Sequence, residues 1–277
     1  MAISAAGVFK MDFTFSDSDK AKYASAKYSL NFIEDGMRIG LGTGSTAAWF
    51  VVLLADFIRK NDINVTTVST SNSTKILAET VGLRVVSLDE IECLDLTVDG
   101  ADEFDDQLNL IKGGGGALLQ EKIVASASSE MIVIADTKKY VKKLGKFPLP
   151  IEVVPFGASF TKKMTDELFS TCGFKNTLGT FRKKDGKNFI TDEGNNIIDY
   201  KLKKIENVHN LSIKINNLAG VVEHGIFTNL CTKVIVGGHN GNLHLYSKQL
   251  KTDEFQTINM NEMNRLSAII IGMKNDK

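Results

Sequence analysis

The chain has 277 residues, 43% of them hydrophobic and 24% charged, and its 33 basic residues balance its 33 acidic ones. A net charge of zero gives no general attraction to nucleic acid or anionic membranes, and no apolar run approaches the roughly 18 residues of a membrane span. Three scattered cysteines without a CxxC pair argue against a disulfide framework or a zinc site and fit the reducing cytosol. The first residues lack the apolar core of a signal peptide, so we expect a cytoplasmic protein.

The first half of the chain alternates helices and strands. Runs of helix-forming residues bounded by N-cap residues or glycine predict the helices, and short apolar or β-branched runs predict the strands. The predicted helices are 20–33, 46–58, 74–82 and 120–128. The predicted strands are 38–41, 63–70, 83–88, 94–98 and 131–135. The alternation predicts a parallel sheet covered on both faces, with ligands beyond the carboxyl ends of its strands.

A domain boundary is predicted where all three prolines fall, within 148–155. Beyond it come the strand-like IEVVPF, a helix near 161–170 and the strand-like NFITD, NIIDYKL and LSIKI, which predict a small α+β domain. VVEHGIF and TKVIVGG resemble the buried strands of the first domain, so we expect the chain to return there. The expected division is a first domain of 16–150 plus 222–250, a small domain of 151–221 and an extension of 251–277 whose role is open.

The segment RIGLGTGSTAAWF places glycines between a predicted strand and a predicted helix. Glycines let the backbone approach an anion, and a helix N-terminus supplies free N–H groups and a positive dipole. A dinucleotide-binding GxGxxG would need glycine in place of Ser45 and an acidic residue after the second strand, where the sequence has Ser69-Thr70-Ser71. The pattern therefore favours the phosphate of a small molecule, with a tight turn that binds nothing as the alternative.

The segment LTVDGADEFDD places carboxylates at the end of another predicted strand. Asp99 ends the strand and Asp102 follows three residues later. Crowded carboxylates raise one another's pKa, which suits proton transfer near neutral pH. A solvated acidic loop and a magnesium site with oxygen ligands are alternatives that the spacing leaves open.

The segment NLIKGGGGALLQEK combines Lys112, four consecutive glycines and Glu121. The run lies between apolar stretches inside a domain and lacks the mixed Gly/Ser composition of a linker. Lys112 beside the acidic loop could neutralise it, which makes a bound metal less necessary. Glu121 taken alone would be an ordinary exposed helix residue. Further on, one lysine of the group at 138–143 could hold a phosphate as a point charge at the end of a strand.

The motifs GTGSTA, DGADE, KGGGGALLQEK and LGKFPLPIEVVPF occur in this order and together resemble ribose-5-phosphate isomerase of type A. The resemblance covers residues 16–250 and leaves out the first fifteen residues and the tail. It implies interconversion of D-ribose 5-phosphate and D-ribulose 5-phosphate in the non-oxidative pentose phosphate pathway, without metal or organic cofactor. It also implies a Rossmann-like domain with a smaller inserted α+β domain, ferredoxin-like in kind, and a homo-oligomer, commonly a dimer.

The same resemblance implies roles for single residues. Glu121 corresponds to the general base, which would shuttle a proton between neighbouring carbons through a cis-enediolate. The residues around the reacting C1–C2 end correspond to Asp99, Asp102 and Lys112. The substrate loop corresponds to Thr43, Gly44, Ser45 and Thr46, and the phosphate-binding lysines to Lys139 and Lys22. Lys112 would stabilise the enediolate charge, and Asp99 or Asp102 would pass protons between O1 and O2.

Two other classes of protein use related features. Sugar-phosphate sensors of transcription regulators bind such ligands without turning them over, but they need a DNA-binding module, and this neutral chain shows no obvious basic one. Coenzyme A transfer uses a glutamate near glycines as a nucleophile, and it would explain Glu121 but leave DGADE and Lys112 without a role. An assay with ribose 5-phosphate separates the three classes.

Overall fold

The computed structural model describes residues 14–248 and 250–275. Its largest element is a seven-stranded sheet with the order β16-β15-β14-β6-β3-β1-β2. Its strands are β1 (Arg38–Leu41), β2 (Thr66–Ser69), β3 (Leu94–Asp99), β6 (Ser128–Asp136), β14 (Lys233–Gly237), β15 (Asn242–Ser247) and β16 (Lys251–Phe255). The strands from β14 to β2 run parallel to their neighbours, and β15 and β16 add an antiparallel edge. The predicted Rossmann-like parallel sheet is confirmed.

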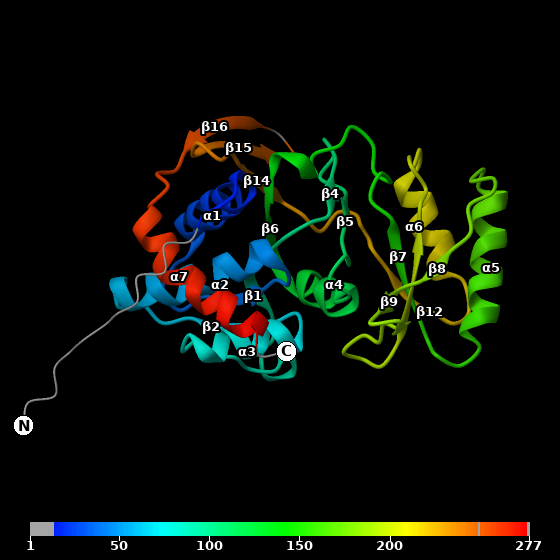
Figure 1. Ribbon diagram of the computed structural model, residues 1–277, viewed down its shortest axis with the longest axis horizontal. Helices are drawn as coiled ribbons and strands as arrows, with labels where there is room; N and C mark the ends of the chain where they lie inside the picture. Colours follow the sequence, from blue (N-terminus) through cyan, green and yellow to red (C-terminus); the bar gives the residue numbers. More distant parts are fainter. Residues whose placement is uncertain (1–13, 249, 276–277) are drawn as a thin grey trace, which may run out of the picture.

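The helices of the described residues follow from local capping and apolar faces. They are α1 (Asp17–Ser29), α2 (Ser45–Asn61), α3 (Asn72–Thr80), α4 (Leu118–Ser126), α5 (Ala158–Thr171), α6 (Val208–Asn216) and α7 (Met260–Asn275). Ser16 and Asp19 form a capping box that starts α1, and the Ser71 side chain caps α3. In Figure 1, α1, α2 and α7 gather beside the main sheet. None of these helices has the length and apolarity needed to cross a bilayer.

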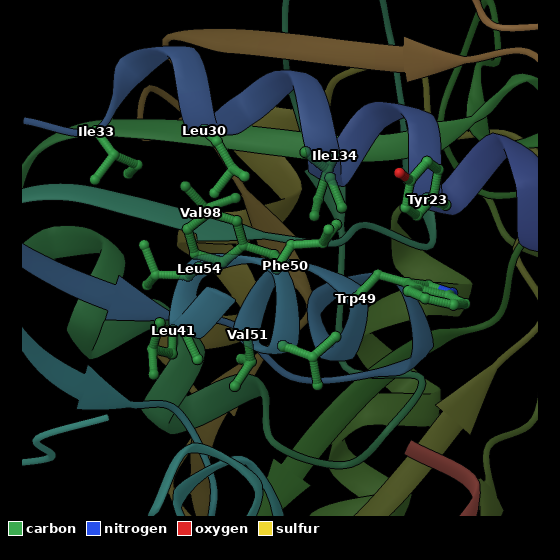
Figure 2. Packing of buried hydrophobic residues seen from close by; sticks show 14 of the residues in the cluster. Tyr23, Leu30, Ile33, Leu41, Trp49, Phe50, Val51, Leu54, Val98 and Ile134 are labelled. Atoms are coloured by element: carbon green, nitrogen blue, oxygen red, sulfur yellow. The ribbon is translucent and has the colours of Figure 1, made fainter. Parts of the chain in front are cut away.

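The main sheet is buried on both faces, as its apolar strands require. Along β6, Ile132 and Ile134 join the cluster formed with α1 and α2, whereas the alternate residues Met131 and Val133 join a second cluster on the opposite face. Figure 2 shows the first cluster, with Phe50 of α2 between the sheet and α1. This packing fixes α1 and α2 against the strands, and the loops at the strand ends are held accordingly.

Between β6 and β14 the chain forms a second lobe beside the main sheet (Figure 1), which we call the inserted lobe and define as residues 149–224. Its antiparallel sheet has the order β12-β7-β11-β8. Those strands are β7 (Leu149–Val153), β8 (Thr180–Phe181), β11 (Asn196–Tyr200) and β12 (Val221–His224). With α5 and α6 they follow the chain order β-α-β-β-α-β, the pattern of ferredoxin-like units. The expected inserted α+β unit is therefore present.

Five shorter strands complete the secondary structure. β9 (Lys183–Lys184) and β10 (Lys187–Asn188) form a small hairpin in the inserted lobe. β4 (Glu103–Phe104), β5 (Leu110–Ile111) and β13 (Ile226–Phe227) form a three-stranded sheet. Because β13 directly follows the inserted lobe and β5 directly precedes Lys112, this small sheet connects the lobe to the glycine run.

Two predicted strands are wrong. Residues 83–88 make only an isolated bridge, Val85 to Thr67, beside the edge strand β2, and a capping box at Ser87 then turns the chain. The segment LSIKI lies in α6, because Asn207 caps a helix there and Leu211 and Ile215 bury one helical face. A run of five residues is too short to distinguish the two structures. Apolar residues two positions apart fit the alternation of a strand, and apolar residues four positions apart fit one face of a helix.

The end of the inserted lobe and the tail also differ from the expected division. β12 pairs with β7, so VVEHGIF begins in the inserted lobe, and we propose to place the return to the first domain after β12. In the tail, β16 is the edge of the main sheet, and α7 buries Met263 and Leu266 in the core with α2. Glu262 of α7 is held by the hydroxyl of Tyr23 and by Lys27 Nζ at 3.1 Å.

The packing in Figure 2 predicts a large loss of stability on truncation of Phe50, whose side chain is 0% exposed. Phe50→Ala should lower the free energy of unfolding by about 3–5 kcal/mol, because it removes buried surface and leaves a cavity. Denaturant unfolding measures this loss. The matched control is Phe160→Ala, at a residue that is 65% exposed. Equal losses for the two variants would contradict the packing.

Candidate active site

The candidate site lies where three parallel strands of the main sheet end. β1, β3 and β6 are consecutive neighbours, and β1 pairs with β2 on its other side. The chain after β1 and the chain after β3 therefore diverge at a topological switch point, where α/β sheets bind their ligands. A cleft of about 290 Å³ opens at this place.

Nearly all the predicted site residues line this cleft. They are Lys22, Thr43, Gly44, Ser45, Thr46, Asp102, Lys112, Glu121 and Lys139. Asp99 is the exception, because its side chain is fully buried and reaches the cleft only through its neighbours. Three larger surface hollows, of about 710, 570 and 510 Å³, contain none of these residues. Sequence reasoning missed Ser18 and Asp136, which also line the cleft.

The glycine loop after β1 brings the backbone against Asp99. A Cβ atom on Gly42 would lie 2.0 Å from Asp99 Oδ1, so only glycine fits there. Gly44 has a φ of 108° and precedes α2 as an N-cap without a side-chain hydrogen bond. The first turn of α2 thus offers its N–H groups and positive dipole to an anion, with the Ser45 and Thr46 hydroxyls beside them.

A network of hydroxyl groups holds Thr43. Its Oγ1 lies 2.7 Å from Thr70 Oγ1, 2.8 Å from Ser71 Oγ and 3.1 Å from Thr74 Oγ1. Its N–H donates to Asp99 Oδ1 at 3.0 Å. The sequence signal for this network is the Ser/Thr-rich STSNST after β2, which sequence reasoning used only as evidence against a dinucleotide.

Three buried charged groups meet beneath the cleft. Lys112 Nζ lies 2.8 Å from Asp99 Oδ2 and 3.0 Å from Glu121 Oε1, and it donates to the carbonyl oxygen of Gly100 at 2.5 Å. The exposed fractions of Asp99, Lys112 and Glu121 are 0%, 2% and 5%. Glu121 Oε2 has no hydrogen-bond partner among the described residues. One carboxylate oxygen at the cleft is therefore free to accept a proton.

Burial and charge set the protonation of this cluster. Burial raises the pKa of the Glu121 carboxyl above its usual 4.5, and the negative charge of Asp99 raises it as well. The positive charge of Lys112 lowers this pKa, but the pKa stays raised overall. Burial alone would lower the pKa of Lys112, but Asp99 and Glu121 outweigh it and raise that pKa. Lys112 therefore stays charged near neutral pH, and Glu121 is the group poised to exchange a proton.

Asp102 differs from Asp99 in its access to the cleft. Asp102 lines the cleft and is half-buried, and its Oδ2 accepts a hydrogen bond from the Gly114 N–H at 2.7 Å. Asp99 Oδ1 is instead occupied by the N–H groups of Thr43 and Gly100, the latter at 2.7 Å. The geometry separates two aspartates that the sequence could not distinguish: Asp102 can touch a ligand, and Asp99 can only support its neighbours.

Two further lysines line the same cleft. Lys22 of α1 and Lys139, at the end of the short turn after β6, both line it. Lys138 does not line it, and Lys143 pairs with Glu206 elsewhere. Asp136 is held by the Ser18 hydroxyl at 3.1 Å and by the Lys138 N–H at 2.9 Å. Two lysines and the first turn of α2 can therefore hold an anion in the cleft that Glu121 also lines.

The described residues contain no group of three or more His, Cys, Asp or Glu side chains arranged to hold a metal ion. Among the histidines, His224 is buried, and burial lowers its pKa to about 3. Within the cleft, the ammonium of Lys112 occupies the position between Asp99 and Glu121 that a cation would take. Asp99 of the DGADE segment thus has an internal counter-charge.

Comparison with known proteins identifies the family to which the chain belongs. Residues 66–241 match the family model described as ribose 5-phosphate isomerase A (phosphoriboisomerase A). Ribose-5-phosphate isomerase A of Ruegeria pomeroyi is 47% identical over 248 residues, which cover 90% of this chain and 95% of that protein. The protein of the same name from Dinoroseobacter shibae is 49% identical over 227 residues, 82% of this chain and 87% of the relative.

Solved structures give the same result. Ribose 5-phosphate isomerase A from Methanocaldococcus jannaschii is 40% identical with a TM-score of 0.73, covering 85% of this chain and 98% of that one. The enzyme from Plasmodium falciparum is 34% identical with a TM-score of 0.78, covering 84% and 100%. A D-ribose-5-phosphate isomerase in complex with phospho-erythronic acid is 38% identical with a TM-score of 0.75, covering 87% and 100%.

The buried cluster makes a prediction about the titration of Glu121. In protein with ¹³C-labelled glutamate carboxyls, one resonance, absent from Glu121→Gln, should titrate well above the usual 4.5 because burial disfavours its charged form. Lys112→Met should raise that pKa further by removing the nearby positive charge. Lys60→Met, at an exposed lysine far along α2, is the control. A Glu121 resonance that titrates at or below 4.5 would contradict the assignment.

Proposed function

The chain belongs to the ribose 5-phosphate isomerase A family, and from this premise we propose how its cleft interconverts D-ribose 5-phosphate and D-ribulose 5-phosphate. One observation carries the proposal: a buried proton acceptor, Glu121, shares a cleft with a basic end formed by Lys22, Lys139 and the start of α2. A phosphorylated pentose has the matching chemistry, with a dianion at C5 and exchangeable hydrogens at C1 and C2. The phospho-erythronic acid bound in a related structure supports a sugar phosphate as the ligand.

Glu121 is the proposed proton shuttle. Moving a carbonyl between C1 and C2 requires that a proton leave the carbon beside the carbonyl and return one carbon away. A single carboxylate can perform both transfers on one face of a cis-enediolate. Glu121 Oε2 has no hydrogen-bond partner in the part of the chain that the structure describes, and the raised pKa of the carboxyl keeps it close to the operating pH, where a general base is most effective.

Lys112 stabilises the negative charge that develops on the enediolate, and Asp99 supports Lys112. Lys112 Nζ donates hydrogen bonds to Gly100 O and Glu121 Oε1 and forms an ion pair with Asp99 Oδ2 at 2.8 Å. In this arrangement Lys112 acts on an enediolate through its positive charge in a dry site. Asp99 keeps Lys112 charged and fixes the glycine loop.

Asp102 is the proposed relay between O1 and O2. It is the aspartate of the pair that lines the cleft, and Gly114 occupies only one of its oxygens. Its second oxygen is available to exchange hydroxyl protons of the sugar and to assist opening of the furanose ring. The phosphate end, held by Ser45, Thr46 and the two lysines, supplies binding energy that fixes the position of the reacting carbons.

Coenzyme A transfer, the competing function, would use only Glu121 and the glycines. Lys112 and Asp102 lie in the same cleft as Glu121, so a function that gives these two residues no role explains less of the site.

We further propose a place in the non-oxidative pentose phosphate pathway, a cytoplasmic location and a homo-oligomer, commonly a dimer. The free state of Cys93, Cys172 and Cys231 is compatible with that compartment.

Glu121→Gln tests the shuttle. The variant should fold normally, because glutamine keeps the shape of the side chain, but kcat should fall by about 10³-fold or more with the loss of the base. KM should change little, since the phosphate contacts are untouched. The measurements are a coupled isomerase assay and exchange of the substrate C2 hydrogen with deuterated water. Near-native turnover, or persistent exchange, would refute the assignment.

Chelation tests the internal counter-charge. Because the ammonium of Lys112 already lies between Asp99 and Glu121, activity should be the same before and after exhaustive dialysis against EDTA. The assay is run on both samples, with and without added Mg²⁺. Loss of activity that magnesium restores would show that the DGADE carboxylates bind a metal instead.

A further inference from the structure

The inserted lobe reaches into the active site through Arg182. This residue lies between β8 and β9, nearly 70 positions from the glycine run. Its Nη1 donates to the carbonyl oxygen of Gly113 at 2.7 Å and to that of Gly114 at 3.1 Å. A cation that donates to two consecutive backbone carbonyls fixes the position of that short stretch of chain.

The guanidinium group is itself held rigidly. Its Nε and Nη2 donate to the two carboxylate oxygens of Asp199 at 2.9 and 2.6 Å, a bidentate pair inside the inserted lobe. The Phe189 ring lies 5.9 Å from the guanidinium. The same ring lies against the end of the glycine run, because a Cβ on Gly116 would be 2.4 Å from it. The inserted lobe therefore contacts both ends of the run.

The glycine run needs such support. Four consecutive glycines have more backbone freedom than any other sequence, and Gly113 and Gly116 adopt φ values of 98° and 85° that other residues rarely take. The N–H of Gly114 is the group that donates to Asp102 Oδ2 at 2.7 Å. Gly114 is therefore held on both sides. Its carbonyl oxygen accepts a hydrogen bond from Arg182, and its N–H donates to Asp102 and orients that side chain.

We propose that Arg182 is a positioning residue for the isomerisation: from the inserted lobe it sets Gly113 and Gly114, and through them the carboxylate of Asp102. The inference rests on the proposed function of the cleft. It predicts an effect at the reacting end of the substrate and none at the phosphate end. Within the described part of the chain, Arg182 donates hydrogen bonds to Asp199, Gly113 and Gly114, and to none of Lys22, Lys139 and the first turn of α2. A residue that merely stabilised the fold would affect both ends alike.

The test is Arg182→Gln in the full-length protein, with Lys184→Gln as the control that loses the same charge at an exposed position two residues away. In Arg182→Gln, kcat should fall by about 10- to 100-fold, the size of effect that a small misplacement of a reacting group produces. The inhibition constant of inorganic phosphate, a probe of the phosphate end, should stay within about twofold of its original value. Lys184→Gln should leave both quantities unchanged.

A double variant separates positioning from general damage. If Arg182 acts through Asp102, Arg182→Gln should lower kcat much less in the Asp102→Asn background than in the original protein. Unchanged kcat in the single variant, a parallel loss of phosphate binding, or penalties that add fully in the double variant would each overturn the inference. The result for Glu121→Gln is independent of all three, so failure of the proposed function and failure of this inference can be told apart.

Discussion

The active site depends on one arrangement, the contact of a single buried ammonium with two buried carboxylates. Removing charges from water is costly, and Lys112 repays that cost only because Asp99, Glu121 and the Gly100 carbonyl surround it closely. Two negative groups share one positive group, so one carboxylate remains under-compensated. Glu121 bears that imbalance, since it lies at the cleft and has an oxygen without a partner. Burial raises the pKa of the Glu121 carboxyl, and the charge of Asp99 also raises it, so the site has a proton acceptor near neutral pH.

The glycines around the cluster follow from this arrangement. Asp99 can approach the loop after β1 only because Gly42 has no Cβ, and the carbonyl of Lys112 approaches Gly225 so closely that a Cβ there would lie 2.2 Å away. The main sheet places Asp99 at a strand end, and β5 and α4 place Lys112 and Glu121 on either side of the glycine run. Three charged side chains from separate elements thus lie within a few ångströms of one another because the backbone segments around them approach closely.

Local patterns in the sequence were enough to predict the parallel sheet, the helices that flank the glycine loop and the residues that gather at the strand ends. They could not separate Asp99 from Asp102, because burial depends on which strands are neighbours. Nor could they identify Thr70, Ser71 and Arg182, whose importance comes from contacts with residues distant in the chain. The strand predicted at 83–88 failed for a related reason, since the edge strand β2 offers it only one bridge.

The two lobes contribute unequally to the two ends of the substrate. Lys22, the start of α2 and Lys139 all belong to the main sheet and its connections, so the phosphate end can form without the inserted lobe. The reacting end needs both lobes, because the glycine run lies between Asp102 on one side and Arg182 on the other. A shift of the inserted lobe would therefore disturb the geometry at C1 and C2 while leaving phosphate binding intact. If the proposed roles of these residues hold, turnover and phosphate affinity are separable in this fold and report on different lobes.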